Sequence, residues 1–305
     1  MTTSTDTSIP TDAIVVGIDG SACAELALDW AAREASLEHR PLVLLHAVHP
    51  PSLGAMAYVE SSGMEYGDLL ARLESDGHAL LRHAAQRVRA EHDVSEVYER
   101  VRMSDPRTAL LEAAAGASAL VVGTRGLGPI RQLLLGSVAM AAVKHAGCPV
   151  AVIRGAEQKN RDVGVMVGVA GDGHDATVLD FAFRVADARG LPVTLVHTFW
   201  DAVGQAETRE VPADDPRHAN QLAVLFEAAG PPSRRYPSVA VHHLLSRGFA
   251  DVQLIASSRR AALLVLGHRR KPFLQELIYG SVAPRVVEHA HCSVAVVPVG
   301  DEPDA

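Results

Sequence analysis

The hydrophobic and polar residues of this chain follow two patterns, which alternate along the sequence. Short apolar runs rich in β-branched residues, at residues 13–18 (AIVVGI) and 41–48 (PLVLLHAV), are typical of buried strands in a parallel sheet. Between them, the apolar residues Leu26, Trp30 and Ala35 recur at helical spacing. Strands that alternate with helices predict right-handed crossovers and a parallel sheet covered by helices on both faces.

The same two patterns continue as far as residue 154. They predict further strands at residues 97–103, 119–123 and 149–154, and further helices at residues 69–89, 106–117 and 137–145. We expect Asp105 to cap the helix that starts at Pro106, because aspartate is a preferred N-cap and proline is tolerated in a first turn. Residues 154–162 (RGAEQKNRD) are polar, follow neither period and are predicted to be a linker.

The chain then repeats itself. One offset of 151 residues (168 − 17) and a later offset of 144 residues (267 − 123) align its two halves, and they pair Gly17 with Gly168, Asp29 with Asp180, His46 with His197, and Gly123 with Gly267. An internal repeat of this length predicts two copies of one domain. We therefore expect an α/β protein of two tandem doubly wound, Rossmann-like domains, each with a five-stranded parallel sheet, at residues 1–154 and 162–305.

A glycine motif at residues 121–137 (VVGTRGLGPIRQLLLGS) carries the candidate chemistry. In an open parallel sheet, ligands bind beyond the carboxyl ends of the strands, where the strand order reverses. Gly123 and Gly126 would let backbone N–H groups approach an anion, and Gly136 with Ser137 would open a helix whose free N–H groups favour a phosphate. The spacing arises by chance in roughly one chain of this length in a hundred. A glycine-rich loop that only turns the chain is the alternative.

These segments, together with VVGIDGS near the first strand and HAGCPVAVI after the motif, resemble the universal stress protein family in its tandem, ATP-binding form. The resemblance covers nearly the whole chain. It implies ATP held between the first and fourth strands of a domain. It also implies pairing of the two domains through their fifth strands, so that the chain is an internal pseudo-dimer that can pair again as a homodimer.

The resemblance also implies a role for each matching residue. Asp19 would contact the ribose, Ala47 would meet the adenine through its backbone, and Arg125 would add charge near the triphosphate. The strand-end glycine Gly17 belongs to the same edge. The ribose and phosphates would lie against Gly123, Gly126, Gly136, Ser137 and Val138. Any Mg²⁺ would be held chiefly by the phosphates, because no cluster of carboxylates with metal-ligand spacing is evident.

The second half departs from this motif at two positions. Asp19 corresponds to Ala170 and Gly126 to Arg270, while Gly168, Gly267, Gly280 and Ser281 are kept. The loss of a carboxylate and the gain of a side chain at a glycine position predict a weaker second nucleotide site, or none. Asp172 and Arg270 are possible substitutes for the lost contacts.

Composition excludes several classes of function. The 305 residues carry a formal net charge of −8 and a pI near 6.0, which offers no basic face for nucleic acid. Three scattered cysteines are too few for a disulfide framework, and no apolar run reaches the length of a membrane span. The start of the chain lacks the features of a signal peptide, and we expect a cytoplasmic protein.

Three interpretations of function remain open. The first is an ATP-binding sensor or regulator of a stress or dormant state, acting on an unknown protein partner. The second is a slow ATPase or phosphotransferase, although neither a P-loop nor a nucleophile elbow is present and no catalytic residue stands out. The third is a structural dimerising module without nucleotide; a flavin-dependent role is remote. Because His46 and His197 recur in both halves, we expect them to be structural.

Overall fold

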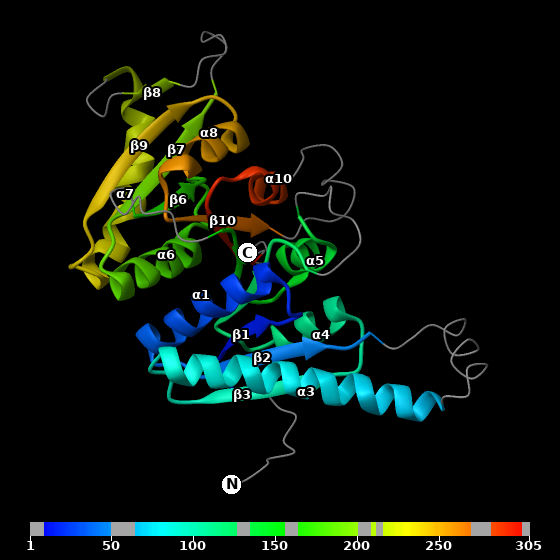
Figure 1. Ribbon diagram of the computed structural model, residues 1–305. Coiled ribbons are helices and arrows are strands. Elements are labelled where there is room, and N and C mark those ends of the chain that lie inside the picture. The colour runs from blue at the N-terminus through cyan, green and yellow to red at the C-terminus, as the bar shows by residue number, and fades with distance from the viewer. Residues whose placement is uncertain are drawn as a thin grey trace. The chain divides into compact units, whose positions relative to one another are not determined.

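The computed structural model describes residues 9–49, 65–126, 135–155, 164–200, 209–211, 216–269 and 282–300. It divides into two compact units, residues 1–148 and 149–305. Both are α/β units with a parallel-dominated sheet, as the alternation of the two hydrophobic periods predicts (Figure 1).

In the first unit, four parallel strands lie in the order β3-β2-β1-β4. They are β1 (Ile14–Gly17), β2 (Leu42–Ala47), β3 (Val97–Arg102) and β4 (Ala119–Gly123). The helices are α1 (Ala22–Glu38), α3 (Tyr66–Glu91), α4 (Pro106–Ala113) and α5 (Ser137–His145). α1 packs against α3 and α4 packs against α5, as two helical layers of a doubly wound sheet. The strands β1 and β4 are direct neighbours, so their carboxyl ends share one edge of the sheet.

Side chains define where two of these helices begin. The Asp105 carboxylate accepts a hydrogen bond from the Arg107 N–H (2.9 Å), with Pro106 in the first turn of α4. The expected cap is therefore confirmed. α1 is capped by Ser21, whose hydroxyl accepts a hydrogen bond from the Ala24 N–H (3.2 Å). α5 differs, because its N-cap is Gly136 and no side chain accepts a hydrogen bond from its first turn.

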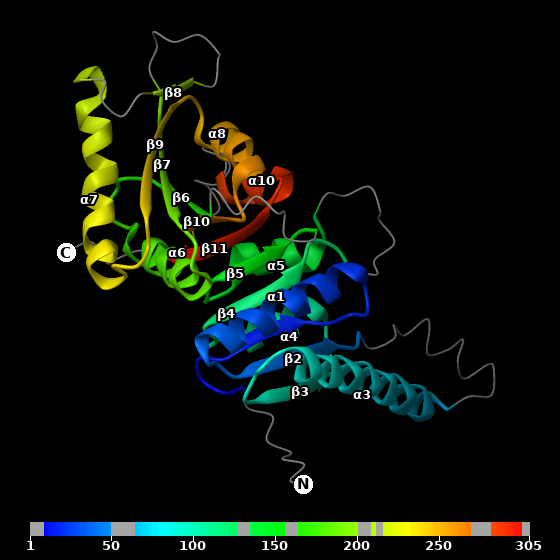
Figure 2. The ribbon, with the colours of Figure 1, turned by 60° about the vertical axis from the view of Figure 1, so that its left-hand side comes forward.

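The second unit has seven strands in the order β5-β11-β10-β6-β7-β9-β8. They are β5 (Val150–Ile153), β6 (Val165–Val169), β7 (Val193–Phe199), β8 (Arg209–Val211), β9 (Val241–Arg247), β10 (Leu263–Arg269) and β11 (Ser293–Val299). Its helices are α6 (Ala176–Arg189), α7 (Ala219–Arg235), α8 (Ala250–Ser257) and α10 (Val282–His289), with short 3₁₀ turns at Pro216–His218 and Ser258–Arg260. Figure 2 shows α7 on one side of this sheet and α8 with α10 on the other.

Two strands of the second unit are antiparallel to their neighbours. β5 comes from the first repeat, and it pairs antiparallel with β11 in the register that places Ala151 opposite Ala295. This is the pairing of fifth strands that the family resemblance implies. All four residues of β5 are buried, and the pairing with β11 keeps this apolar strand from presenting an exposed edge. β8, antiparallel to β9, has no counterpart in the sequence prediction.

The central strands form the core of each unit. Every residue of β1 and β6 is buried except Gly17 and Gly168, as expected for strands that carry helices on both faces. Cys148 and Cys292 are buried and Cys23 is half-buried, and none of the three forms a disulfide. Among the helices that the structure describes, none combines the length and the apolar character needed to cross a membrane.

Candidate functional site

The carboxyl ends of β1 and β4 bring the central candidate residues together. Asp19 follows β1, and Thr124, Arg125 and Gly126 follow β4. The Asp19 carboxylate lies so close to Gly126 that a Cβ at this glycine would clash with Oδ2. The two positions that change together in the second repeat are thus in contact in the first.

A hydrogen-bonded turn orients Asp19. Its Oδ1 accepts a hydrogen bond from the Ser21 N–H (2.9 Å), and the Ser21 hydroxyl donates to the Arg125 carbonyl (3.4 Å). Asp19 is half-buried, whereas Arg125 and Gly126 are exposed. The turn therefore links the loop after β1 to the loop after β4 and presents a carboxylate between them.

Gly123 has a packing role that differs from the one inferred from the motif. A Cβ at this position would lie 2.7 Å from both the carbonyl carbon and the oxygen of Cys23, in the first turn of α1. These are backbone atoms, which cannot rotate away. Gly123 is therefore required for the approach of α1 to β4, whether or not a ligand binds nearby. Gly17 is likewise in a packed place, where a Cβ would lie 3.3 Å from the Leu110 methyl groups of α4.

The start of α5 lies beside the same loop. The Gly136 N–H donates a hydrogen bond to the Thr124 carbonyl (2.7 Å), which ties the helix to the residue after β4. Ser137 is exposed and Val138 is half-buried. Within the described part of the chain, the N–H groups of Ser137 and Val138 have no acceptor. The positive end of a helix dipole with free donors is suited to an anion.

A histidine holds the end of β1 to the neighbouring strand. His46 Nδ1 lies 2.7 Å from the Ile18 carbonyl, and His197 Nδ1 lies 2.9 Å from the Val169 carbonyl at the equivalent place in the second repeat. In each case Nδ1 donates, since a carbonyl can only accept. The structural role expected for both histidines is confirmed. Ala47 follows His46 as the last residue of β2 and is half-buried.

In the second repeat, the chain's own carboxylates occupy the loop after β6. Asp175 accepts hydrogen bonds from the N–H groups of Ala170 (3.0 Å) and Gly171 (2.8 Å). Asp172 forms an ion pair with Arg269 (3.0 Å), and its backbone carbonyl lies 2.9 Å from His174 Nδ1. Sequence reasoning missed Asp175, because α6 begins three residues later than the repeat predicts and nothing in the aligned motif marks that shift.

The remaining candidates in this repeat are less defined. Gly168 packs against Leu266 and Leu254, and Gly267 against Val178 and Val299. Arg270, Gly280 and Ser281 lie outside the described residues, as does most of the predicted linker. Arg154, at the start of that linker, donates to the backbone carbonyls of Val287 and Glu288.

A protein-family model matches the sequence over the same two repeats. The model of the universal stress protein family matches this chain twice, at residues 10–154 and 164–298. The chain belongs to the universal stress protein family. The two matches correspond to the two repeats that the sequence offsets define.

A relative found by sequence supports this assignment. A universal stress protein of Mycolicibacterium smegmatis is 31% identical over 300 residues, which cover 93% of this chain and 96% of the relative. A crystal structure of a universal stress protein from Archaeoglobus fulgidus matches 96% of this chain and 98% of its own, at 18% identity and a TM-score of 0.70. A solved universal stress protein in complex with cAMP is 28% identical and matches 48% of this chain and 99% of its own, with a TM-score of 0.37.

Proposed function

We propose that the first repeat of this universal stress protein binds ATP at the carboxyl ends of β1 and β4, and that occupancy regulates a stress response. In this proposal Asp19 contacts the ribose, and the backbone of Ala47 meets the adenine. The phosphates lie against the loop after β4 and the start of α5, near Gly123, Arg125, Gly126, Gly136, Ser137 and Val138. Mg²⁺ would be held chiefly by the phosphates.

The contact between Asp19 and Gly126, beside the uncapped start of α5, carries the proposal. A carboxylate is an acceptor suited to sugar hydroxyls, and free N–H donors at a helix start are suited to phosphate. Both groups contact the residues that directly follow β4, because Asp19 lies against Gly126 and the Gly136 N–H donates to the Thr124 carbonyl. A nucleotide carries both groups in one molecule, which makes it the ligand class that best fits this edge.

We propose that the second repeat binds nucleotide weakly or not at all. Its aligned position has Ala170 in place of the carboxylate, and the nearby N–H groups already donate to Asp175. Arg269, which aligns with Arg125, is held by Asp172. A phosphate would have to displace both carboxylates from charge-assisted contacts, which are stronger than neutral hydrogen bonds. We therefore expect one ATP per chain.

The test starts with the nucleotide released on denaturing the purified protein, identified by mass spectrometry, followed by calorimetric titration with ATP, ADP, AMP and cAMP. We expect ATP binding at one site per chain, and an affinity at least tenfold weaker for Asp19→Ala, a loss of about 1.4 kcal/mol. Asp93→Ala is the matched control, because it removes an exposed carboxylate at the other end of the sheet. Binding that is equal in both variants would place the site elsewhere.

Regulation requires that the bound state differ from the free one. We expect ATP to slow amide exchange in peptides that contain Gly123 and Gly136, which flank the glycine motif. Phosphate release above the buffer rate, lost in Asp19→Ala, would instead favour the slow ATPase. Absence of any nucleotide binding would favour the dimerising module.

Assembly belongs to the same proposal. We propose domain boundaries at residues 1–154 and 162–305, an internal pseudo-dimer joined through β5 and β11, and a homodimer of chains that presents its surface to a protein partner. Light scattering coupled to size-exclusion chromatography, with and without ATP, measures the oligomer directly. A mass of one chain under both conditions would contradict the homodimer.

A further inference from the structure

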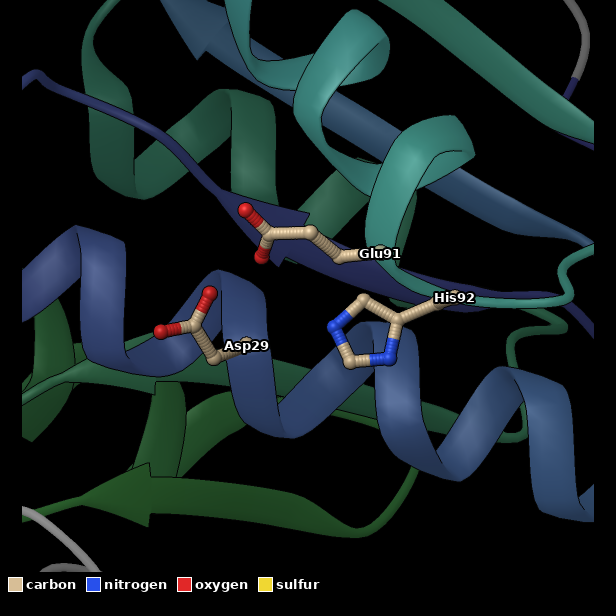
Figure 3. A group of neighbouring side chains, drawn as sticks. All are labelled: Asp29, Glu91 and His92. Carbon is tan, nitrogen blue, oxygen red and sulfur yellow. The ribbon is translucent and has the colours of Figure 1, made fainter.

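Three potential metal ligands meet where the end of α3 lies beside α1 in the first unit. Asp29 lies in the middle of α1, Glu91 is the last residue of α3, and His92 follows it as the C-cap. One ligand atom from each residue lies within 4.8 Å of the others. Figure 3 shows the two carboxylates turned toward each other, with the imidazole ring beside Asp29.

Of these three side chains, only Asp29 has an ion-pair partner among the described residues. Asp29 Oδ1 forms an ion pair with Arg87 (2.9 Å), and Arg87 also pairs with Glu25 (2.7 Å). Among the residues that the structure describes, the Glu91 carboxylate has no hydrogen bond or ion pair, and neither has the His92 ring. Glu91 and His92 thus offer potential ligand atoms that no described residue of the chain engages.

The second repeat provides an internal comparison for this corner. Asp29 corresponds to Asp180, and the ends of α3 and α7 correspond at the later offset (235 − 91 = 144), which pairs Glu91 with Arg235 and His92 with Tyr236. There Arg235 forms an ion pair with Asp180 Oδ1 (2.7 Å), and the Tyr236 hydroxyl donates to the same oxygen (3.2 Å). Burial, and then the charge of Asp180, raise the pKa of Tyr236, which keeps this hydroxyl protonated.

The corresponding positions beside the aspartate therefore carry side chains of different chemistry in the two repeats. In the second repeat, two donors of the chain neutralise the aspartate. In the first repeat, Arg87 from the preceding turn of α3 pairs with Asp29. The two residues equivalent to Arg235 and Tyr236 are metal-ligating types, a carboxylate and an imidazole, and neither side chain has a partner among the described residues. This contrast is independent of the distances within the cluster.

We infer that Asp29, Glu91 and His92 form a site for a divalent transition-metal ion, with Zn²⁺ as the first candidate, that links the end of α3 to α1. One imidazole nitrogen and two carboxylate oxygens suit Zn²⁺ and its neighbours, whereas Mg²⁺ and Ca²⁺ prefer oxygen ligands alone. Bonds of about 2.0–2.2 Å place tetrahedral ligands roughly 3.3 Å apart. Asp29 and Glu91 are exposed and His92 is half-buried, so rotation of the two carboxylate side chains brings the ligands to this spacing, and water completes the coordination.

The decisive variant copies the second repeat into the first. Glu91→Arg combined with His92→Tyr places beside Asp29 the two side chains that this chain already uses beside Asp180. We expect the double variant to keep the fold and to lose the site. Single variants Glu91→Gln and His92→Gln, which preserve side-chain size more closely, test each ligand separately.

The measurements use the full chain after treatment with a chelator. Zn²⁺ is titrated by calorimetry, and Co²⁺ is used as a spectroscopic probe of ligand number. We expect one ion per chain, at least tenfold weaker binding in each single variant, and no binding at this site in the double variant. Zn²⁺ should also raise the melting temperature of the unaltered protein and leave that of the double variant unchanged.

The control separates this site from adventitious binding by other histidines. His83→Gln removes an exposed histidine of the same helix, outside the cluster. Unchanged Zn²⁺ binding in this control, with loss in the double variant, supports the site. Equal titration curves for the double variant and the unaltered protein, or loss of binding in His83→Gln, would overturn it.

Discussion

The Asp19 carboxylate occupies the space that a side chain at position 126 would need, so Asp19 and Gly126 depend on each other. The second repeat agrees at the level of sequence, because it has Ala170 and Arg270 at these positions. Where the carboxylate is absent, the glycine is absent too. The immediate reason for Gly126 is thus a neighbouring side chain, whether or not a phosphate binds nearby.

This dependence predicts non-additive effects on stability. Gly126→Ala in the unaltered protein should displace the carboxylate and lower the free energy of unfolding by about 1 kcal/mol, the lower end of the cost of overpacking. In an Asp19→Ala background the same change should cost close to nothing. Urea denaturation of the four proteins of this double-mutant cycle measures the coupling, which we expect to exceed about 0.5 kcal/mol. Equal costs in both backgrounds would contradict the contact.

Gly123 should be more sensitive to alanine than its counterpart Gly267. A Cβ at Gly123 meets backbone atoms of Cys23 at 2.7 Å, whereas a Cβ at Gly267 meets methyl groups of Val178 and Val299 at 3.1 Å. Backbone cannot yield, so we expect Gly123→Ala to cost about 1–3 kcal/mol. Gly267→Ala should cost less, because a side chain can shift by a few tenths of an ångström.

Calorimetric melting of the two variants tests this order. A cost of 1–3 kcal/mol lowers the melting temperature of a unit this size by several degrees, at roughly 2–4 °C per kcal/mol. If both variants melt alike, the close approach of α1 to β4 is not what requires Gly123. If the order holds, loss of ATP binding in Gly123→Ala would report a packing defect, and variants of Asp19 are the better probes of the ligand.

The sequence predicted the fold well because the fold depends on periodicity. Buried strands and amphipathic helices each have a pattern that survives in a single sequence, and the internal repeat shows it twice. The edge shared by Asp19 and Gly126 could also be predicted, since parallel strands place their carboxyl ends together.

Other features depend on contacts between residues far apart in the chain, and the sequence pattern does not record these. The packing of Gly123 against Cys23 is one. The contact of Asp175 with Ala170 is local, but it depends on the later start of α6, which the sequence repeat does not predict. The cluster of Asp29 with Glu91 and His92 joins two helices across 62 residues (91 − 29), far beyond any metal-ligand spacing that a motif could show. Each depends on where the helices lie in the folded chain.

The three cysteines should differ sharply in reactivity. Burial raises the pKa of the Cys148 thiol to about 11 and that of Cys292 to about 12, so both remain protonated at pH 8. Since the thiolate is the nucleophile, about one molecule in a thousand carries reactive Cys148 at that pH. A thiol reagent should therefore label only Cys23 quickly, and all three residues after unfolding in urea. A protein with Cys23→Ser that still shows a fast-labelled thiol would contradict this order.

The cap of α4 predicts a pH dependence that one substitution isolates. Hydrogen bonds from the Arg107 side chain, together with backbone N–H groups of the first turn, lower the pKa of Asp105 from 3.8 to about 2. A carboxyl group whose pKa is lowered by folding stabilises the protein above its unfolded pKa, and this contribution is lost as the pH falls through the folded value. Asp105→Asn keeps a capping oxygen but cannot ionise. We expect the unaltered protein to exceed this variant in unfolding free energy at pH 7, and the difference to shrink as the pH falls from about 4 to 2.

Urea denaturation across this pH range measures the difference in unfolding free energy. The variant Asp105→Ala, which should cost about 1 kcal/mol at pH 7, shows how much the cap itself contributes. A difference between the unaltered protein and Asp105→Asn that stays constant with pH would show that the ionised carboxylate adds nothing to the cap.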